Sequence, residues 1–398
     1  MACQPAQAWP LAGSLSLGDV LRAGLPAYSR TNRMPAHHWK VLNALQVCRT
    51  PLLGGHQYQC ARCGCGHFVP HGCGNRHCPS CQGVHSRRWL DAQAKLLLPV
   101  TYFHEVFTLP HQLNSLVDQN QSALYGLLFD TVSQTLLTFG RNNLGAQVGV
   151  TAVLHTWGQS LSGHYHLHCI VTGGGPAPDG SRWVRSRSDY LFPVRALSKV
   201  YRAKFCEGLQ ALYARGKLQF HGQLRELTQE RQFQGLVREA TRKSWNVYSK
   251  RPFAGPEQVL AYLSRYTHRV GLSNRRLLEL DAVGGTVSFA YKDYADGSRH
   301  KTMTLTLEEF IRRLRLHLLP PRFVKIRHYG LLGNRGRQKR LEAARKLVGS
   351  PGKEMVAAVA PPPRSGLCCP HCGCTLLLLV RVFPPQRWVP APAGIDSS

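Results

Sequence analysis

Eleven of the fourteen cysteines lie in two short clusters, and their spacing restricts this chain more than any other feature of the sequence. Two C-x-x-C pairs, Cys60 with Cys63 and Cys78 with Cys81, stand fourteen residues apart. Each pair places two sulfurs on one side of an ion, and two such pairs complete a tetrahedral zinc site. The spacing therefore predicts that Cys60, Cys63, Cys78 and Cys81 bind one structural Zn²⁺; the alternative is four buried free thiols.

The remaining cysteines leave the number of metal sites open. Cys48, His56, Cys65, Cys73 and His77 lie among the four predicted ligands and supply enough donors for a second ion. Near the other end of the chain, Cys369 and Cys372 form one further pair. A single pair completes a site only when the N-terminal cluster, another neighbour or another subunit contributes the missing ligands.

The charge of the chain indicates a polyanionic partner. Lys and Arg number 50 against 21 Asp and Glu, which gives a net charge of +29, and the basic residues are spread along the whole sequence. The longest apolar runs fall far short of the roughly 20 residues that span a bilayer, so no membrane-spanning segment is expected. The N-terminus does not resemble a secretory signal, and we therefore expect a cytoplasmic protein associated with DNA.

Composition divides the chain into three expected domains. Residues 1–95 are rich in cysteine and histidine, residues 96–318 alternate strand-like and helical patterns, and residues 319–398 form a basic, cysteine-containing tail. In the middle domain we expect strands at 102–109, 148–157 and 164–172, and helices at 112–139, 196–213 and 257–270. A hairpin is expected from 286–294 and 300–305. The predicted fold class is α+β.

Three histidines alternate along the expected strand 164–172, in the sequence HYHLHCIV. On a strand, His164, His166 and His168 project from one face, and two imidazoles at such positions can chelate one divalent ion. The alternative is a polar sheet face without a metal. A second element of the sequence bears on this choice.

Tyr262 and Tyr266 stand four residues apart on the expected helix 257–270, so both hydroxyls point the same way. Arg265 and Arg269 make a similar pair on a neighbouring face, where they suit phosphate contacts. Two tyrosines at this spacing also fit simple packing. Taken with the histidine strand, they indicate instead a tyrosine that attacks a DNA phosphodiester with the help of Mg²⁺ or Mn²⁺, because a phenol with a pKa near 10 is otherwise a weak nucleophile.

Several long motifs resemble the IS91 family of rolling-circle insertion-sequence transposases. They are CRTPLLGGH, NRHCPSCQ, VLHTWGQSLSGHYHLHCIVTGGG, YLSRYTHRVGLSNRRL and RHYGLLGNRGR, in this order, from about residue 48 to 337. The resemblance implies a HUH endonuclease fold, in which two histidines flank a bulky apolar residue on an antiparallel sheet with helices, plus a small N-terminal zinc-binding domain. It assigns His166 and His168 to the metal, Tyr262 and Tyr266 to catalysis, and Cys60, Cys63, Cys78 and Cys81 to zinc.

The function expected from these motifs is a transposase that nicks and joins single-stranded DNA through 5′-phosphotyrosine intermediates, at transposon ends and in target DNA. For the third metal ligand we favour Gln258, one helical turn before Tyr262, with His164 as the alternative. Arg265, Arg269, Arg335 and Arg337 are the candidate DNA contacts.

Two other functions remain open, namely a rolling-circle replication initiator with the same chemistry and a zinc-finger DNA-binding protein without catalysis. The oligomeric state is also open, and a homo-oligomer fits the sequence.

Overall fold

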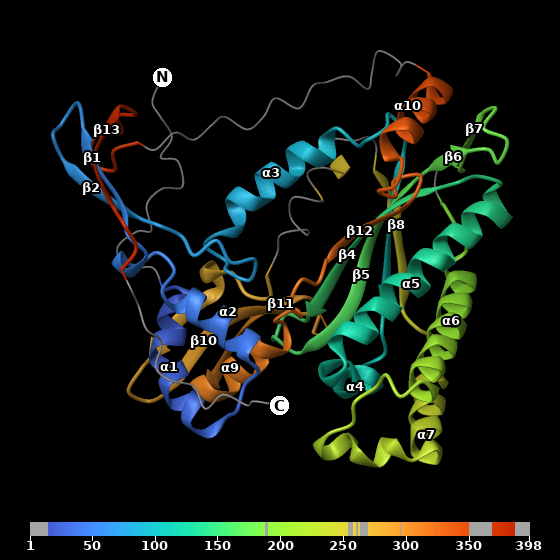
Figure 1. The fold of residues 1–398 in the computed structure, drawn as a ribbon, viewed down its shortest axis with the longest axis horizontal. Helices are drawn as coiled ribbons and strands as arrows, with labels where there is room; N and C mark the ends of the chain where they lie inside the picture. The colour runs from blue at the N-terminus through green and yellow to red at the C-terminus, as the bar shows by residue number, and fades with distance from the viewer. Residues whose placement is uncertain are drawn as a thin grey trace.

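The computed structural model describes residues 15–187, 190–253, 258, 259, 262, 270–294, 296–349 and 368–386. Among these residues, no helix combines the length and the apolar character needed to cross a membrane. Figure 1 shows a larger part built on a central sheet, a smaller part made of helices and a second sheet, and a small sheet of strands from both ends of the chain.

A five-stranded antiparallel sheet forms the centre of the larger part, in the order β12-β4-β5-β3-β8. Its strands are β3 (Tyr102–Thr108), β4 (Gly149–Trp157), β5 (Gly163–Thr172), β8 (Val247–Phe253) and β12 (Ile326–Gly330). Strands β4 and β5 form a hairpin whose register pairs His155 with His166 and Val153 with His168. Directly paired residues share a face of the sheet, so His155, His166 and His168 lie on the same face.

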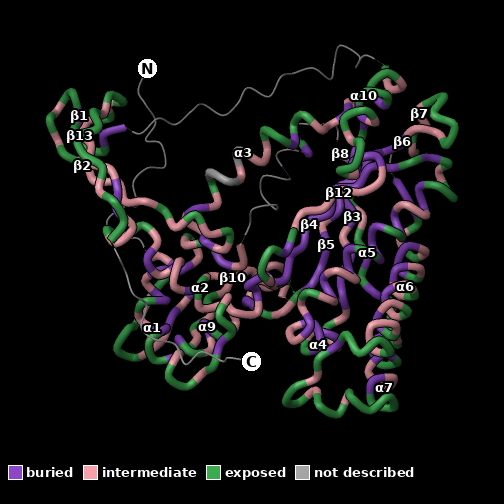
Figure 2. Tube along the Cα trace, in the orientation of Figure 1, coloured by how far each residue is buried: buried purple, intermediate pink, exposed green. Residues whose placement is uncertain are grey.

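The other face of the sheet is covered by helices α5 (Gln121–Phe139) and α6 (Val194–Ala214), with α4 (Asn114–Gln119) and α7 (Glu230–Thr241) at one end (Figure 1). Leu124, Leu128 and Val132 recur at four-residue spacing along α5 and are fully buried against sheet residues such as Phe107. Each such side chain contributes roughly 1.5–3 kcal/mol to folding. Figure 2 shows the buried residues gathered on the sheet and these helices. The histidine-bearing face is the one that α5 and α6 leave uncovered.

The smaller part brings together the start and the later part of the chain. Helices α1 (Leu17–Thr31) and α2 (Ala36–Gln46) pack with strands β9 (Leu277–Asp281), β10 (Thr286–Asp293) and β11 (Arg299–Thr306) and with helix α9 (Leu307–Leu316). Helix α1 begins with a capping box between Ser16 and Asp19, and α9 begins with Thr306 accepting the N–H of Glu309. Leu21, Phe289 and Phe310 are fully buried in the core that these elements share.

Strands from both ends of the chain form a third sheet, in the order β13-β1-β2. Strands β1 (Gly55–Cys60) and β2 (Gly66–Pro70) carry the first cysteines, and β13 (Leu377–Phe383) pairs with β1 (Figure 1, blue and red). Helix α3 (Gln82–Ala94) follows the N-terminal cysteines, α10 (Arg337–Val348) follows β12, and a short hairpin is formed by β6 (Gly174–Pro176) and β7 (Trp183–Arg185).

Most of the expected elements are present, and the predicted mixed α+β class with antiparallel sheets is confirmed. The strands expected at 102–109, 148–157 and 164–172 are β3, β4 and β5, and the expected hairpin is β10 with β11. The helix expected at 112–139 is instead divided into a 3₁₀ turn, α4 and α5. The division falls at Asn120, whose side-chain amide donates to the carbonyls of Leu116 and Gln219.

The structure differs from the expected division at residue 318. Strand β12 pairs with β4 inside the central sheet, and β13 pairs with β1, so residues 319–398 include parts of two sheets and are no mere tail. In turn, β9–β11 and α9 pack against α1 rather than against the central sheet. Strand pairing between residues far apart in sequence decides these associations, and composition carries no information about it.

Candidate functional site

Three histidines from the central hairpin form a group that fits one metal ion. The ring nitrogens of His155, His166 and His168 all lie within 4.8 Å of one another. The Nε2 atoms of His166 and His168 are 3.1 Å apart, and two nitrogens bound at about 2.1 Å to one ion lie about 3.0–3.4 Å apart. His155 comes from β4, opposite His166, and contributes the third imidazole.

Hydrogen bonds orient two of these rings so that their Nε2 lone pairs face each other. Nδ1 of His166 donates to the backbone carbonyl of His164 at 2.9 Å, which leaves Nε2 of His166 unprotonated for a metal. On His168, Nδ1 lies 3.0 Å from the Tyr262 hydroxyl and 2.9 Å from Nε2 of His104. A metal at Nε2 of His168 leaves the proton on Nδ1, which donates to this pair.

Burial keeps this site in the form that binds metal. Desolvation, with the nearby His168 and His164, holds the pKa of His166 well below its usual range. Desolvation, with Lys250 and His166, lowers the pKa of His104 to about 3. Both rings are therefore neutral at physiological pH, and a neutral imidazole is the form that ligates a metal.

Tyr262 lies directly behind His168. Its side chain is 7% exposed, and its hydroxyl is 2.6 Å from Nε2 of His104 as well as 3.0 Å from Nδ1 of His168. Together with Val259, one turn earlier, it packs against Ile170 and Tyr102 on the sheet face opposite to α5 and α6. The hydroxyl thus reaches the side of His168 opposite to the Nε2 that faces His166, and it is part of the hydrogen-bonded support of that ring.

The sequence-based site is only partly within the described residues. Tyr266, Arg265 and Arg269 lie outside them. Gln258, the favoured third ligand, has an exposed side chain, and His164 contributes its carbonyl to His166. The histidine that joins His166 and His168 is His155, which the sequence analysis missed.

A sequence signal for His155 exists. It stands near the end of the first strand of a tight hairpin, where residues equally distant from the turn face each other across the two strands. His104 was also missed. Its neighbour Phe103 packs in the core beneath α5, and because side chains alternate along a strand, His104 points to the opposite face.

The two predicted arginines beyond β12 lie at the start of α10. Arg335 is exposed, and Arg337 donates a hydrogen bond to Asn334. Burial, together with the positive charge of Arg337, lowers the pKa of His328 to about 4. His328 lies on β12 and contacts Thr151 on β4. Thr151 alternates with Val153 and His155, so Arg337 stands near the same face of the sheet as the histidine group.

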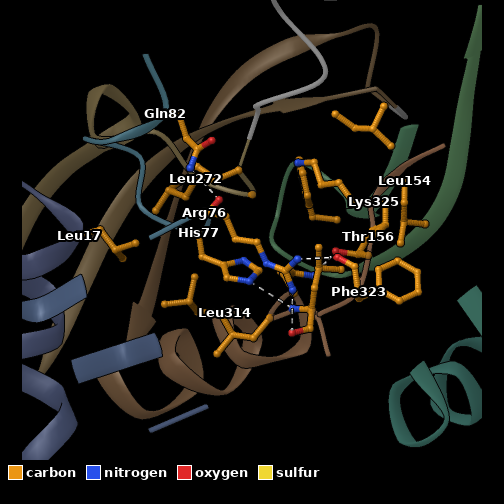
Figure 3. A pocket seen from close by; sticks show the side chains of 18 of the residues that line it. Leu17, Arg76, His77, Gln82, Leu154, Thr156, Leu272, Leu314, Phe323 and Lys325 are labelled. Carbon is orange, nitrogen blue, oxygen red and sulfur yellow. Dashed lines mark hydrogen bonds between the residues drawn. The ribbon is translucent and has the colours of Figure 1, made fainter. Parts of the chain in front are cut away.

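A pocket of about 360 Å³ lies beside Trp157, at the end of β4 (Figure 3). Arg76 and His77 line one side, and Thr156, Phe323 and Lys325 line the other. Trp157, which also lines the pocket, stacks on His155 with ring centroids 4.8 Å apart, and Nζ of Lys325 lies 5.8 Å from the Trp157 ring centre.

Apolar side chains form most of the wall of this pocket, and its basic groups are Arg76, His77, His317 and Lys325. Burial, with the charge of Arg76, lowers the pKa of Lys325 to about 8, and burial lowers the pKa of His77 to about 3. Arg76 and Lys325 therefore carry the positive charge, while His77 is neutral. The lining residues that the structure describes include no carboxylate. Such a pocket suits an anion that carries a flat ring.

Eight of the described cysteines form two groups of four, and neither group is the predicted one. Cys78 and Cys81 join Cys48 and Cys73, with sulfur distances of 3.3 Å (Cys48 to Cys78), 3.6 Å (Cys48 to Cys81) and 3.8 Å (Cys73 to Cys81). Sulfurs bound at about 2.3 Å in a tetrahedral site lie about 3.8 Å apart, so this group fits one zinc ion.

Cys60 and Cys63 lie instead beside Cys369 and Cys372. The prediction of a single site made of Cys60, Cys63, Cys78 and Cys81 is therefore wrong. Strand β1 carries Cys60 and Cys63 away from the second pair and toward β13.

The chain is similar to known transposases along most of its length. A family model described as "Putative transposase" matches residues 149–340, and one described as "Transposase zinc-binding domain" matches residues 20–109. "Putative transposase y4qJ" of Sinorhizobium fredii (strain NBRC 101917 / NGR234) is 41% identical over 388 residues, which cover 93% of this chain and 96% of that protein.

Two further similarities are weaker. The "Transposase for insertion sequence element IS801" of Pseudomonas savastanoi pv. phaseolicola is 26% identical over 314 residues, which cover 74% of this chain and 70% of that protein. A solved conjugative relaxase, TrwC in complex with oriT DNA, is 16% identical over 43% of this chain and 65% of its own. Its TM-score of 0.24 is too low to support any argument.

Proposed function

This chain belongs to the IS91 family of transposases, which are DNA-processing enzymes, and we propose that it nicks and rejoins single-stranded DNA through phosphotyrosine intermediates to move an insertion sequence by rolling-circle transposition. The observation that carries the proposal is the group of three histidines whose ligand His168 is hydrogen-bonded to a tyrosine hydroxyl. Metal ligands and a candidate nucleophile thus meet on one face of the sheet, the face opposite to α5 and α6.

The donor set indicates which ion this site holds. His155, His166 and His168 offer three nitrogens, whereas Mg²⁺ prefers an octahedron of oxygens. Of the two ions expected from the sequence, Mn²⁺ accepts imidazole more readily, and phosphate and water oxygens can fill its remaining positions. When bound, the ion would polarise the phosphodiester and stabilise the charge that develops on it. The cysteine groups suit Zn²⁺ in a structural role.

The proposed cleavage transfers the 5′-phosphate of the cut DNA strand to a tyrosine of the protein. The tyrosine oxygen gives up its proton and attacks phosphorus, a bond from phosphorus to the tyrosine oxygen forms, and the bond to the 3′ oxygen of the preceding nucleotide breaks. The leaving 3′ oxygen takes up one proton, so the step neither gains nor loses protons overall. The products are a 5′-phosphotyrosine and a 3′-OH. Attack by a 3′-OH reverses the step and rejoins the strand without an external energy source. Two tyrosines, Tyr262 and Tyr266, allow a second strand to be cleaved while the first remains attached.

The position of Tyr262 sets a condition for this chemistry. Its hydroxyl is held by His104 and His168 on the side of the His168 ring away from His166. To attack a phosphate at the metal centre, the hydroxyl has to leave these partners. We propose that entry of the DNA strand draws Tyr262 out, and that Tyr266 is the second nucleophile.

The DNA partner is supported by charge and by shape. The chain carries a net charge of +29, Lys250 and Arg337 stand near the histidine-bearing face of the sheet, and Arg335 is exposed two residues before Arg337. We propose that the pocket beside Trp157 takes one nucleotide of the single strand, with its base against the aromatic ring and its phosphate near Lys325. Stacking on aromatic rings and phosphate contacts are the usual means of holding single strands. Arg265 and Arg269 remain proposed DNA contacts.

The experiment that tests this function separates cleavage from binding. The double variant His166→Ala/His168→Ala should lose Mn²⁺-dependent nicking of a labelled single strand from the element's ends and keep most of its gel-shift affinity. His111→Ala, a histidine outside the group, serves as the control. Full nicking by the double variant would reject the metal assignment.

The other two functions have their own signatures. A zinc-finger DNA-binding protein without catalysis would give a gel shift and no nick even in the wild type. A replication initiator would give the same nick, and flanking DNA without the ends of an insertion sequence would favour it.

A further inference from the structure

The six-residue motif C-x-x-C-G-C occurs twice in this chain, at residues 60–65 and at residues 369–374. In the first copy, Cys60 N–H donates to the carbonyl of Cys65, and Gly64 N–H donates to the carbonyl of Cys60. In the second copy, Cys369 N–H donates to Cys374, and Gly373 N–H donates to Cys369.

The two copies also share a backbone conformation. Gly64 and Gly373 have φ values of +70° and +72°, which favour glycine, and no atom lies within 4 Å of an added side-chain carbon at either position. The glycines are therefore needed for the turn and not for close packing. Two segments with the same sequence pattern have folded into the same turn, and each turn presents two sulfurs on one side.

Strand pairing brings these turns together. Strand β13 lies antiparallel to β1, with Leu377 opposite Cys60, and Ala61 N–H donates to the carbonyl of Leu376. The motifs sit at the adjoining ends of the paired strands, just after β1 and just before β13. Their separation in sequence is therefore no obstacle to a common site.

The sulfur geometry fits one tetrahedral ion. Sγ of Cys60 is 3.5 Å from Sγ of Cys372, and Sγ of Cys63 is 3.6 Å from Sγ of Cys369. All four sulfurs lie within 4.8 Å of one another. A disulfide requires about 2.05 Å, so these are not cystines, whereas sulfurs around Zn²⁺ lie about 3.8 Å apart.

Each half of the group has similar surroundings. A backbone hydrogen bond from Cys65 reaches the Cys63 thiol, and one from Cys374 reaches the Cys372 thiol. Nε2 of His67 lies 3.1 Å from Sγ of Cys369. Thiolate ligands in metal sites are commonly stabilised by donors of this kind.

We propose that Cys60, Cys63, Cys369 and Cys372 bind a second structural Zn²⁺ that fastens the C-terminal segment 368–386 to the N-terminal module, residues 20–109. This site is separate from the one formed by Cys48, Cys73, Cys78 and Cys81, whose members Cys78 and Cys81 are part of the core of the smaller part. The proposal does not depend on the nicking chemistry, because it concerns only what holds the two ends together.

Zinc content of the purified full-length protein tests the proposal. The wild type should hold two zinc ions per chain, one for each four-cysteine group. Cys60→Ser and Cys372→Ser should each remove the same ion, so Cys60→Ser/Cys372→Ser should remove no more than either alone. Cys60→Ser/Cys78→Ser should remove both ions, and Cys206→Ser, outside both groups, should remove none.

Other outcomes overturn the proposal. One zinc per wild-type chain contradicts it, and so does unchanged zinc content in Cys372→Ser. Loss of only one ion in Cys60→Ser/Cys78→Ser also contradicts it, because Cys60 and Cys78 would then share a site. Retention of one zinc by Cys372→Ser also shows that the rest of the N-terminal module still folds. In limited proteolysis, Cys372→Ser should release the C-terminal segment faster than Cys206→Ser, and equal rates would contradict the fastening role.

Discussion

Replacement of Tyr262 by Phe should weaken Mn²⁺ binding even in the absence of DNA. The substitution keeps the ring that packs on Ile170 and removes the hydroxyl that contacts Nδ1 of His168 at 3.0 Å. Loss of such a supporting hydrogen bond typically lowers metal affinity about 10- to 100-fold, or by roughly 1.4 to 2.7 kcal/mol. The structure points to the lower end of this range, because Nε2 of His104, 2.9 Å from the same Nδ1, remains as an acceptor.

The assay is a calorimetric titration of the full-length protein with Mn²⁺ at neutral pH. Tyr262→Phe should raise the Kd about 10-fold, and Tyr262→Phe/His104→Ala, which removes both acceptors, about 100-fold. Tyr248→Phe is the matched control, since Tyr248 stands on the neighbouring strand β8 and is 53% exposed. A Kd for Tyr262→Phe within two-fold of wild type, or an equal loss in Tyr248→Phe, would refute the idea that Tyr262 supports a metal ligand.

Three further predictions concern the third ligand, the buried Glu105 and the pocket. His155→Ala should weaken Mn²⁺ binding by more than about 100-fold, while His164→Ala should change it less, because His164 lies outside the group of three and its backbone carbonyl, which accepts from His166, is kept. The reverse order in the same titration would restore His164 as the ligand. Burial raises the pKa of Glu105 from 4.5 to about 8, so the folded protein keeps this carboxyl protonated at pH values at which the unfolded chain ionises it. The free energy of unfolding is therefore highest below about pH 4.5 and falls by up to roughly 5 kcal/mol as the pH rises to about 8. Glu105→Gln should therefore be more stable than wild type at pH 9 in urea denaturation, with Glu279→Gln on the exposed surface as control, and equal stability at pH 9 would contradict the pKa shift. Trp157→Ala should weaken the binding of single-stranded DNA by about 1–3 kcal/mol and leave the binding of duplex DNA nearly unchanged. The measurement omits Mn²⁺ because Trp157 stacks on His155. Unchanged binding of single-stranded DNA would contradict the proposal that a nucleotide occupies this pocket.

The sequence predicted strands β4 and β5 and the histidine face of β5 because both depend on local alternation. Strand residues two apart share a face, so the pattern HYHLHCIV places His166 and His168 together without knowledge of the rest of the fold. His155 was missed because its contact runs across strands, and that contact requires the register of the β4–β5 hairpin.

The cysteine groups show the limit of spacing as a guide. Four cysteines in two nearby pairs were expected to share an ion, yet each pair lies beside two cysteines from elsewhere in the chain. Cys63 and Cys369 are 306 positions apart, and only the pairing of β1 with β13 brings them together. The repeated C-x-x-C-G-C motif was visible in the sequence, and comparing its two copies would have indicated a shared site.

Buried polar residues also escaped the sequence analysis. His104 and Glu105 are neighbours on β3, but they face opposite sides of the sheet, one toward Tyr262 and the other into the helix-covered core. Their environments depend on which helices cover which face, and that information arises only from tertiary packing.

The covalent adduct between protein and DNA tests the central claim most directly. The wild type, incubated with Mn²⁺ and a single strand from the element's ends, should yield a nucleotide-bearing peptide in mass spectrometry that contains Tyr262 or Tyr266. Tyr262→Phe and Tyr266→Phe should each retain an adduct through the other hydroxyl, and the double variant should form none. An adduct on a tyrosine outside this segment, such as Tyr291 or Tyr294, or cleavage that persists in the double variant, would contradict the account.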